Sequence, residues 1–83
     1  MPTITAAIIT FNEERNIQRC LDSLKNCVDD ILVLDSFSTD NTLGICKENN
    51  VRVIQHEWLG YSKSKNYLNS FITSDLIFSI DAD

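Results

Sequence analysis

The chain has 83 residues, which is enough for one small domain, and we treat residues 1–83 as a single unit. Its formal net charge of −5 and its lack of a basic cluster argue against nucleic-acid binding, because nothing would neutralise the phosphates. No apolar stretch approaches the ~20 residues of a transmembrane helix, and no secretory signal precedes the first apolar run, so we expect a cytoplasmic protein.

The first two elements differ in their apolar periodicity. Residues Ile4–Thr10 are a short apolar run typical of a strand. Residues 12–25 instead repeat apolar side chains at helical spacing, with Ile17, Leu21 and Leu24 on one stripe. The pattern therefore predicts a strand followed by an amphipathic helix.

The start of this helix is predicted at Asn12. Asparagine is a favoured N-cap residue, since its side chain can accept a hydrogen bond from an unpaired backbone N–H of the first turn. Glu13 and Glu14 would then lie in the first turn, where negative charge complements the helix dipole.

The rest of the chain continues the alternation. Residues Asp30–Asp35 form a continuous apolar run, which predicts a strand buried on both faces. Helices are predicted over residues 41–49 and 60–71, and strands over 51–55 and 75–80. The order β-α-β-α-β-α-β predicts a three-layer α/β fold with a parallel four-stranded sheet and right-handed crossovers. Strand order 3-2-1-4 is expected, as in half of a Rossmann-like domain.

Three cysteines occur, Cys20, Cys27 and Cys46. Their odd number and the absence of CxxC spacing argue against a zinc site and against a disulfide framework. Cys20 and Cys46 fall on apolar helical positions, where a free cysteine behaves as a small hydrophobic residue. We therefore predict reduced core cysteines, as in a cytosolic protein.

Polar residues follow each predicted strand at its carboxyl end. In an open parallel sheet these ends meet at one rim, which is where ligands bind. The four tracts are Thr10-Phe11-Asn12-Glu13-Glu14, Asp35-Ser36-Phe37-Ser38-Thr39-Asp40, His56-Glu57-Trp58 and Asp81-Ala82-Asp83. Gathered carboxylates indicate a divalent cation, because Mg²⁺ or Mn²⁺ takes one or two carboxylates and fills its other positions with water and phosphate oxygens. Trp58 is expected to pack over the rim, and no catalytic or metal role is expected for His56.

The glycine-rich phosphate motifs are absent. Neither GxGxxG nor GxxxxGK[ST] occurs, and the segment after the first strand is bulky and acidic. A bound diphosphate would therefore depend on a metal at the Asp81/Asp83 end of the last strand.

Four tracts resemble the N-terminal half of the family 2 glycosyltransferases: AAIITFNEERNIQRCLDSL, DDILVLDSFSTDNT, GYSKSKN and DLIFSIDAD. This family is inverting, has the GT-A fold and uses nucleotide-diphospho-sugars. The tract QHEWLGYSKSKNYLNS is most similar to lipopolysaccharide-core β-glucosyltransferases of bacteria. The resemblance implies transfer of a sugar, expected to be a hexose, from a UDP-sugar to a glycan or lipid-linked acceptor in cell-envelope polysaccharide synthesis.

The resemblance also implies roles at the base of the nucleotide. Thr10 and Phe11 would pack on the base, usually uracil, and hydrogen-bond to it. Glu13 would approach the base or the ribose, and Asp35 would accept a hydrogen bond from the uracil N3–H. Asp40 would order the turn and cap the following helix.

The remaining implied roles concern the phosphates. Lys65 stands where the family has arginine and would contact the nucleotide as a point charge, without the arginine fork. Asp83 would be the ligand of Mg²⁺ or Mn²⁺ on the diphosphate. Asp81 would contact the ribose, or the metal through water.

In this family the catalytic base and the acceptor pocket lie beyond the DxD motif. The resemblance therefore implies a chain that is truncated after that motif and inactive alone, from a protein that is cytoplasmic or peripheral at the inner face of the membrane. Two alternatives remain open. One is a receiver-like Mg²⁺-binding signalling module, which would need a phosphoacceptor after the third strand, where Gln55-His56 stands. The other is a folded piece that binds nothing and forms a homodimer through an exposed sheet edge.

Overall fold

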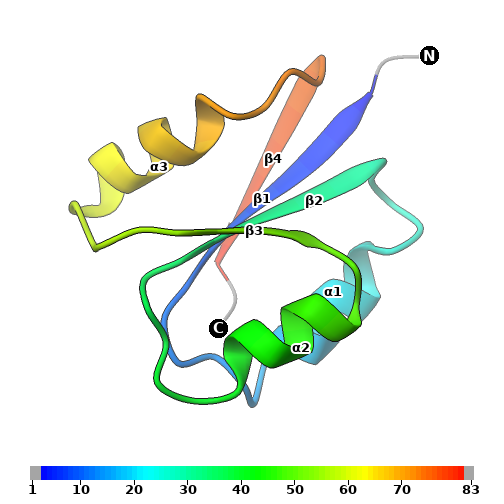
Figure 1. The fold of residues 1–83 in the computed structure, drawn as a ribbon. Helices are drawn as coiled ribbons and strands as arrows, with labels where there is room; N and C mark the ends of the chain where they lie inside the picture. The colour runs from blue at the N-terminus through cyan, green and yellow to red at the C-terminus, as the bar shows by residue number, and fades with distance from the viewer. Residues whose placement is uncertain (1–2, 82–83) are drawn as a thin grey trace.

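The computed structural model describes residues 3–81, apart from the side chains of Tyr61 and Asp81. Its centre is a parallel four-stranded sheet with helices on both faces (Figure 1). The strands are β1 (Ile4–Thr10), β2 (Asp30–Asp35), β3 (Arg52–Gln55) and β4 (Leu76–Asp81), and the helices are α1 (Ile17–Leu24), α2 (Thr42–Glu48) and α3 (Tyr61–Asn69). The order β3-β2-β1-β4 confirms the predicted three-layer α/β fold and its 3-2-1-4 topology.

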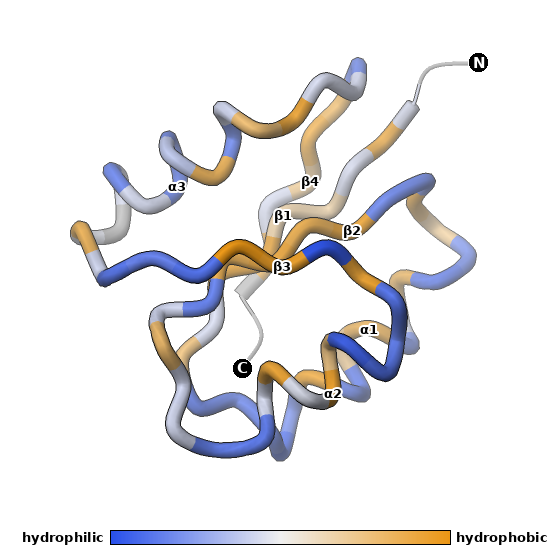
Figure 2. Tube along the Cα trace, in the orientation of Figure 1, coloured by the Kyte–Doolittle hydropathy of each residue, from blue (hydrophilic) through white to orange (hydrophobic). Residues whose placement is uncertain are grey.

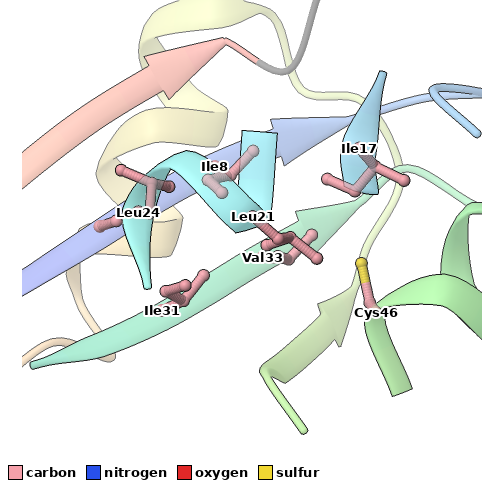
Figure 3. Packing of buried hydrophobic residues seen from close by; sticks show 8 residues of the cluster. Ile8, Ile17, Leu21, Leu24, Ile31, Val33 and Cys46 are labelled. Atoms are coloured by element: carbon pink, nitrogen blue, oxygen red, sulfur yellow. The ribbon is translucent and has the colours of Figure 1, made fainter. Parts of the chain in front are cut away.

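The larger part of the core lies on the face that α1 and α2 cover. In Figure 3 the side chains of α1 point toward Ile8 and Val33 of the sheet, and Cys46 of α2 completes the cluster. The buried residues of this cluster are Ala6, Ile8, Ile17, Leu21, Leu24, Ile31, Val33 and Cys46. The stripe predicted for the first helix is therefore the surface that α1 buries.

A smaller cluster lies on the opposite face, under α3. It consists of Ala7, Leu32, Leu34 and Leu68, with four half-buried neighbours, Ile9, Ile54, Tyr67 and Ile72. Successive side chains of β1 and β2 alternate between the two clusters, because side chains of a strand point to opposite faces. This alternation explains why both central strands are apolar almost throughout, which Figure 2 shows in orange.

The first helix begins later than the sequence predicts. Asn12 has a φ of 53°, in the left-handed region, and α1 begins at Ile17 with Asn16 as its N-cap residue. Glu13 and Glu14 precede the helix, and the Glu13 carbonyl accepts hydrogen bonds from the N–H groups of Asn16 and Ile17 at 3.0 and 2.8 Å. The predictions of an Asn12 cap and of a first acidic turn are therefore wrong. Their physical cause is that the Asn12 side chain bonds a different loop, described below.

The three cysteines are free. Cys46 is fully buried and Cys20 packs half-buried against the same cluster, as predicted, whereas Cys27 is exposed, so the prediction of a core cysteine is wrong there. Burial, with smaller effects from Asp35 and Cys20, raises the pKa of the Cys46 thiol to about 11. Cys46 therefore stays protonated near neutral pH and acts as a packing residue.

The sheet has one apolar edge. Among the described residues β4 pairs with β1 alone, and three consecutive side chains of β4 are exposed, Leu76, Ile77 and Phe78. None of the helices in residues 3–81 is long and apolar enough to cross a membrane.

Candidate functional site

The loops that follow β1 and β2 lie next to each other at the carboxyl ends of the strands (Figure 1). The Asn12 side chain joins them, since its Oδ1 accepts hydrogen bonds from Thr39 N–H at 2.7 Å and from Asp40 N–H at 3.3 Å. The Asn12 N–H in turn donates to Ser38 Oγ at 2.8 Å. Each of the two loops thus donates hydrogen bonds to the other.

A second set of bonds surrounds Asp40. Its carboxylate accepts hydrogen bonds from Glu14 N–H at 3.2 Å, from Thr42 N–H at 2.9 Å and from the Thr42 hydroxyl, and that hydroxyl accepts one from Glu13 N–H at 2.8 Å. Desolvation raises the pKa of Asp40, but these hydrogen bonds together lower it below its usual value. Asp40 therefore orders the turn and bonds Thr42, whereas the N-cap residue of α2 is Asn41 and not Asp40.

Asp35 ends β2 and is fully buried. Its carboxylate accepts hydrogen bonds from Thr10 Oγ1 at 2.8 Å, from Ser38 N–H at 3.0 Å, from the Ser38 hydroxyl and from Gln55 Nε2 at 3.4 Å. Buried carboxylates need such partners, and here three segments of the rim supply them. Asp35 therefore ties the ends of β1 and β3 to the loop after β2.

A pocket of about 410 Å³ opens at this rim. Among the described residues it is lined by Phe11, Ser36 and Trp58, which follow β1, β2 and β3 respectively. Phe11 and Trp58 are 58% and 54% exposed, so their rings are available to a ligand. Ser36 Oγ is buried without a hydrogen-bond partner in the part of the chain that the structure describes. The pocket thus offers aromatic, almost wholly apolar surface, which suits a flat ring, whereas the unpartnered Ser36 hydroxyl is itself buried.

The structure brings the base-contact residues of the sequence prediction together at this rim. Phe11 lines the pocket, and Thr10 lies buried beside it with its hydroxyl on Asp35. Glu13 is half-buried at the loop junction, where its Oε2 accepts a hydrogen bond from Asn16 Nδ2 at 3.4 Å. Lys65 is half-buried on α3 and does not belong to the described lining of the pocket.

Of the two predicted metal ligands, Asp81 alone has a described backbone. Asp81 closes β4 and pairs in register with Ile9 of β1, so its backbone lies next to the end of β1 that leads to Phe11. Its side chain and the whole of Asp83 lie outside the described part. Within the described part, no three or more histidine, cysteine or acidic side chains form a cluster that could hold a metal ion.

Comparison with known proteins identifies the family. Residues 5–83 match the model of Glycosyl transferase family 2. The chain belongs to glycosyltransferase family 2. This glycosyltransferase chain is 45% identical over 83 residues to an uncharacterized glycosyltransferase of Rickettsia felis, covering 100% of this chain and 29% of that protein. It is 41% identical over 85 residues to the SPbeta prophage-derived glycosyltransferase SunS of Bacillus subtilis, covering 99% and 20% respectively.

A solved enzyme shares the fold of this glycosyltransferase chain. Glucosyl-3-phosphoglycerate synthase from Mycobacterium tuberculosis, in complex with Mn²⁺, UDP and glucosyl-3-phosphoglycerate, matches with a TM-score of 0.84 and 28% identity. The match covers 99% of this chain and 34% of the synthase. The same synthase has been solved with Mn²⁺, UDP-glucose and phosphoglyceric acid, with a TM-score of 0.84. The chain thus has the strand topology of the GT-A fold and spans about a third or less of the length of these proteins.

Two pocket residues of the glycosyltransferase chain were not predicted as ligand contacts. The sequence predicts no role for Ser36 and predicts that Trp58 packs over the rim. In the structure, Trp58 is more than half exposed and lines the pocket. Sequence carries no signal for Ser36, because three further hydroxyl or carboxyl residues follow it within four positions. Only the fold shows which of these groups lacks a partner.

Phe37 of the glycosyltransferase chain adopts an unfavourable backbone conformation. Its φ is 56° and its side chain is 54% exposed, so burial does not compensate for the left-handed backbone. This conformation costs a bulky residue about 1–2 kcal/mol. Phe37→Gly is therefore expected to raise the free energy of unfolding by about 1 kcal/mol, measured by urea denaturation.

Phe37→Ala is the matched control, since it removes the ring and keeps the side-chain carbon that causes the strain. Its stability is expected to stay at or below that of the wild type. Equal stabilisation by glycine and alanine would show that the ring, and not the left-handed backbone, is responsible.

Proposed function

We propose that this family 2 glycosyltransferase chain binds the nucleotide of a UDP-sugar in the pocket that Phe11, Ser36 and Trp58 line. The observation that carries the proposal is an aromatic pocket with an unpartnered hydroxyl at the carboxyl ends of the strands. A pyrimidine would pack its flat face on the aromatic side chains, and the Ser36 hydroxyl, which is buried in this structure, would turn about its χ1 bond to reach the polar edge of the base. The matching synthase structures, solved with UDP and UDP-glucose, support this assignment.

The surrounding polar residues are proposed to complete the nucleotide site. Thr10 and Asp35, which directly precede the pocket residues Phe11 and Ser36, are held together by their mutual hydrogen bond. A bond from the uracil N3–H to Asp35 would compete with Ser38 or Gln55 for a carboxylate oxygen, since both oxygens already accept protein donors. Glu13 is proposed to approach the ribose, and Lys65 to contact the nucleotide as a point charge.

Asp81 and Asp83 are proposed to hold Mg²⁺ or Mn²⁺ on the diphosphate. Two carboxylates one residue apart, at the end of a strand next to β1, are a suitable donor set for either ion. When bound, the ion would neutralise the negative charge that develops on the departing nucleoside diphosphate. The synthase structures that contain Mn²⁺ support a divalent ion.

The transfer itself is proposed by family resemblance. We propose an inverting transfer of a hexose to a glycan or lipid-linked acceptor in cell-envelope polysaccharide synthesis, by a cytoplasmic or peripheral enzyme of the lipopolysaccharide-core β-glucosyltransferase type. The 83 residues alone are expected to bind the donor without transferring the sugar, because they correspond to 29% of the Rickettsia felis relative. Homodimerisation through the exposed apolar edge of β4 also stays a prediction. The family match favours this proposal over a receiver-like module.

Asp83→Ala is expected to abolish the effect of Mn²⁺ on UDP binding and to leave metal-free UDP binding unchanged. The reason is that the carboxylate would act on the nucleotide only through the ion. Calorimetric titration of UDP with and without Mn²⁺ measures both quantities.

Asp75→Ala is the matched control, because Asp75 precedes the opposite end of β4 and accepts a hydrogen bond from Thr3 N–H at 2.9 Å. This variant is expected to keep the dependence on Mn²⁺. An Asp83→Ala variant whose UDP affinity still rises with Mn²⁺ would refute the assignment of Asp83 as the metal ligand.

A further inference from the structure

Asn12 lies where the loop after β1 meets the loop after β2, and its hydrogen bonds connect the two loops. Its left-handed backbone, with a φ of 53°, turns the chain immediately after Phe11. Its Oδ1 accepts hydrogen bonds from Thr39 N–H at 2.7 Å, from Asp40 N–H at 3.3 Å and from Thr39 Oγ1 at 3.4 Å. One exposed side chain therefore satisfies two backbone N–H groups of a loop 27 residues away.

The position of this bridge matters because strand pairing ends before the pocket begins. Thr10 and Asp35 are the last residues paired between β1 and β2, and Ser36 N–H donates to the Thr10 carbonyl at 2.9 Å. Phe11 and Ser36, which line the pocket, come directly after this point. Past the paired strands, the bonds of Asn12 with residues 38–40 are the first to join the segment of Phe11 to the segment of Ser36. The bonds of Glu13 and Glu14 with Thr42 and Asp40 follow.

We propose that Asn12 is a positioning residue of the nucleotide pocket, whose amide sets the spacing between Phe11 and Ser36. The inference rests on the proposed function, in which the pocket holds the base of UDP. Asparagine suits this position for two physical reasons. It tolerates a positive φ better than most residues, and its amide oxygen accepts hydrogen bonds from the N–H groups of Thr39 and Asp40.

Asn12→Gly tests the proposal, because glycine keeps the backbone conformation and removes the acceptor. At a temperature well below the unfolding midpoint, this variant is expected to bind UDP about tenfold more weakly than the wild type in the presence of Mn²⁺. Its affinity for Mn²⁺ with inorganic pyrophosphate, which has no base, is expected to stay unchanged. Isothermal calorimetry measures both affinities.

Asn50→Gly is the matched control. Asn50 also has a left-handed backbone, with a φ of 58°, and lies near Asp29 and Val51, away from the rim. It is expected to bind UDP like the wild type. Asn12→Asp, which keeps an acceptor oxygen and tolerates the same backbone, is expected to bind UDP within about threefold of the wild type.

Each remaining outcome contradicts the inference in a distinct way. Wild-type UDP affinity in Asn12→Gly would overturn the role of the amide. An equal loss of UDP and pyrophosphate binding would indicate general structural damage instead of a misplaced base pocket. An Asn12→Asp variant as weak as Asn12→Gly would show that the acceptor oxygen is not what matters. Absence of UDP binding by the wild type would overturn the proposed function, and this inference with it.

Discussion

Replacing Asp35 by alanine is expected to lower the free energy of unfolding by about 3 kcal/mol. The buried carboxylate accepts hydrogen bonds from Thr10, Ser38 and Gln55, and its loss leaves these donors without their acceptor. Each buried polar group left unpaired costs about 1–3 kcal/mol, and water reaching the rim recovers part of this. Urea denaturation, with the midpoint and slope compared with those of the wild type, measures the change.

Asp35→Asn is the conservative control for this prediction. The amide keeps the shape of the side chain and one acceptor oxygen, so a loss of about 1 kcal/mol is expected. UDP binding should weaken in both variants, since the carboxylate bonds Thr10, Ser38 and Gln55, which lie close to the pocket residues along the chain. An alanine variant as stable as the wild type would show that these hydrogen bonds do not hold the rim together.

Replacing Phe11 by alanine is expected to lower UDP affinity by about ten- to a hundredfold. Stacking of a base on an aromatic side chain contributes about 1–3 kcal/mol, and each 1.4 kcal/mol corresponds to about tenfold in affinity. Stability is expected to change little, because the Phe11 ring is 58% exposed. Calorimetric titration of the folded variant with UDP measures the affinity.

Phe78→Ala is the matched control, because Phe78 is 52% exposed and lies on β4, paired with Ala6 in the middle of β1. It removes the same ring from a surface away from the pocket and is expected to leave UDP affinity unchanged. Equal affinity of the Phe11 variant and the wild type would place the base elsewhere on the rim.

The fold could be predicted from the sequence because the apolar pattern of each helix and strand lies within its own segment. Residues 31–34 form an uninterrupted apolar run, and the structure places β2 there with these side chains buried on both faces of the sheet. The stripe of Ile17, Leu21 and Leu24 likewise becomes the buried face of α1. Each helix or strand buries the apolar side chains of its own segment. The order of the elements therefore follows from the apolar periodicity, and the parallel topology follows from right-handed connections between the strands.

The start of α1 could not be predicted from the same signals. Asparagine is a favoured N-cap residue, but the side-chain oxygen of Asn12 accepts hydrogen bonds from Thr39 N–H and Asp40 N–H instead. Capping rules consider only the neighbouring turn, whereas these partners are more than 25 residues away. The helix therefore begins at Ile17, and Glu13 and Glu14 belong to the loop between β1 and α1.

The candidate site could be predicted in outline. Parallel strands bring their carboxyl ends to one rim, so the proximity of Phe11, Asp35 and Trp58 follows from topology. Whether each side chain points inward is decided by packing: Asp35 is buried among donors, and the Ser36 hydroxyl has no partner among the described residues. Those orientations depend on contacts between loops, which the sequence pattern does not encode.

Calorimetric titration of the folded 83-residue chain with UDP, with and without Mn²⁺, tests the central claim most directly. The proposed site predicts saturable binding of UDP at millimolar concentrations or below, which Mn²⁺ strengthens. It also predicts weaker binding of ADP, whose larger base does not match a pocket that holds a pyrimidine. A chain that is folded by circular dichroism and yet gives no binding heat at millimolar UDP, with or without Mn²⁺, would contradict the claim that this rim is a nucleotide-sugar site.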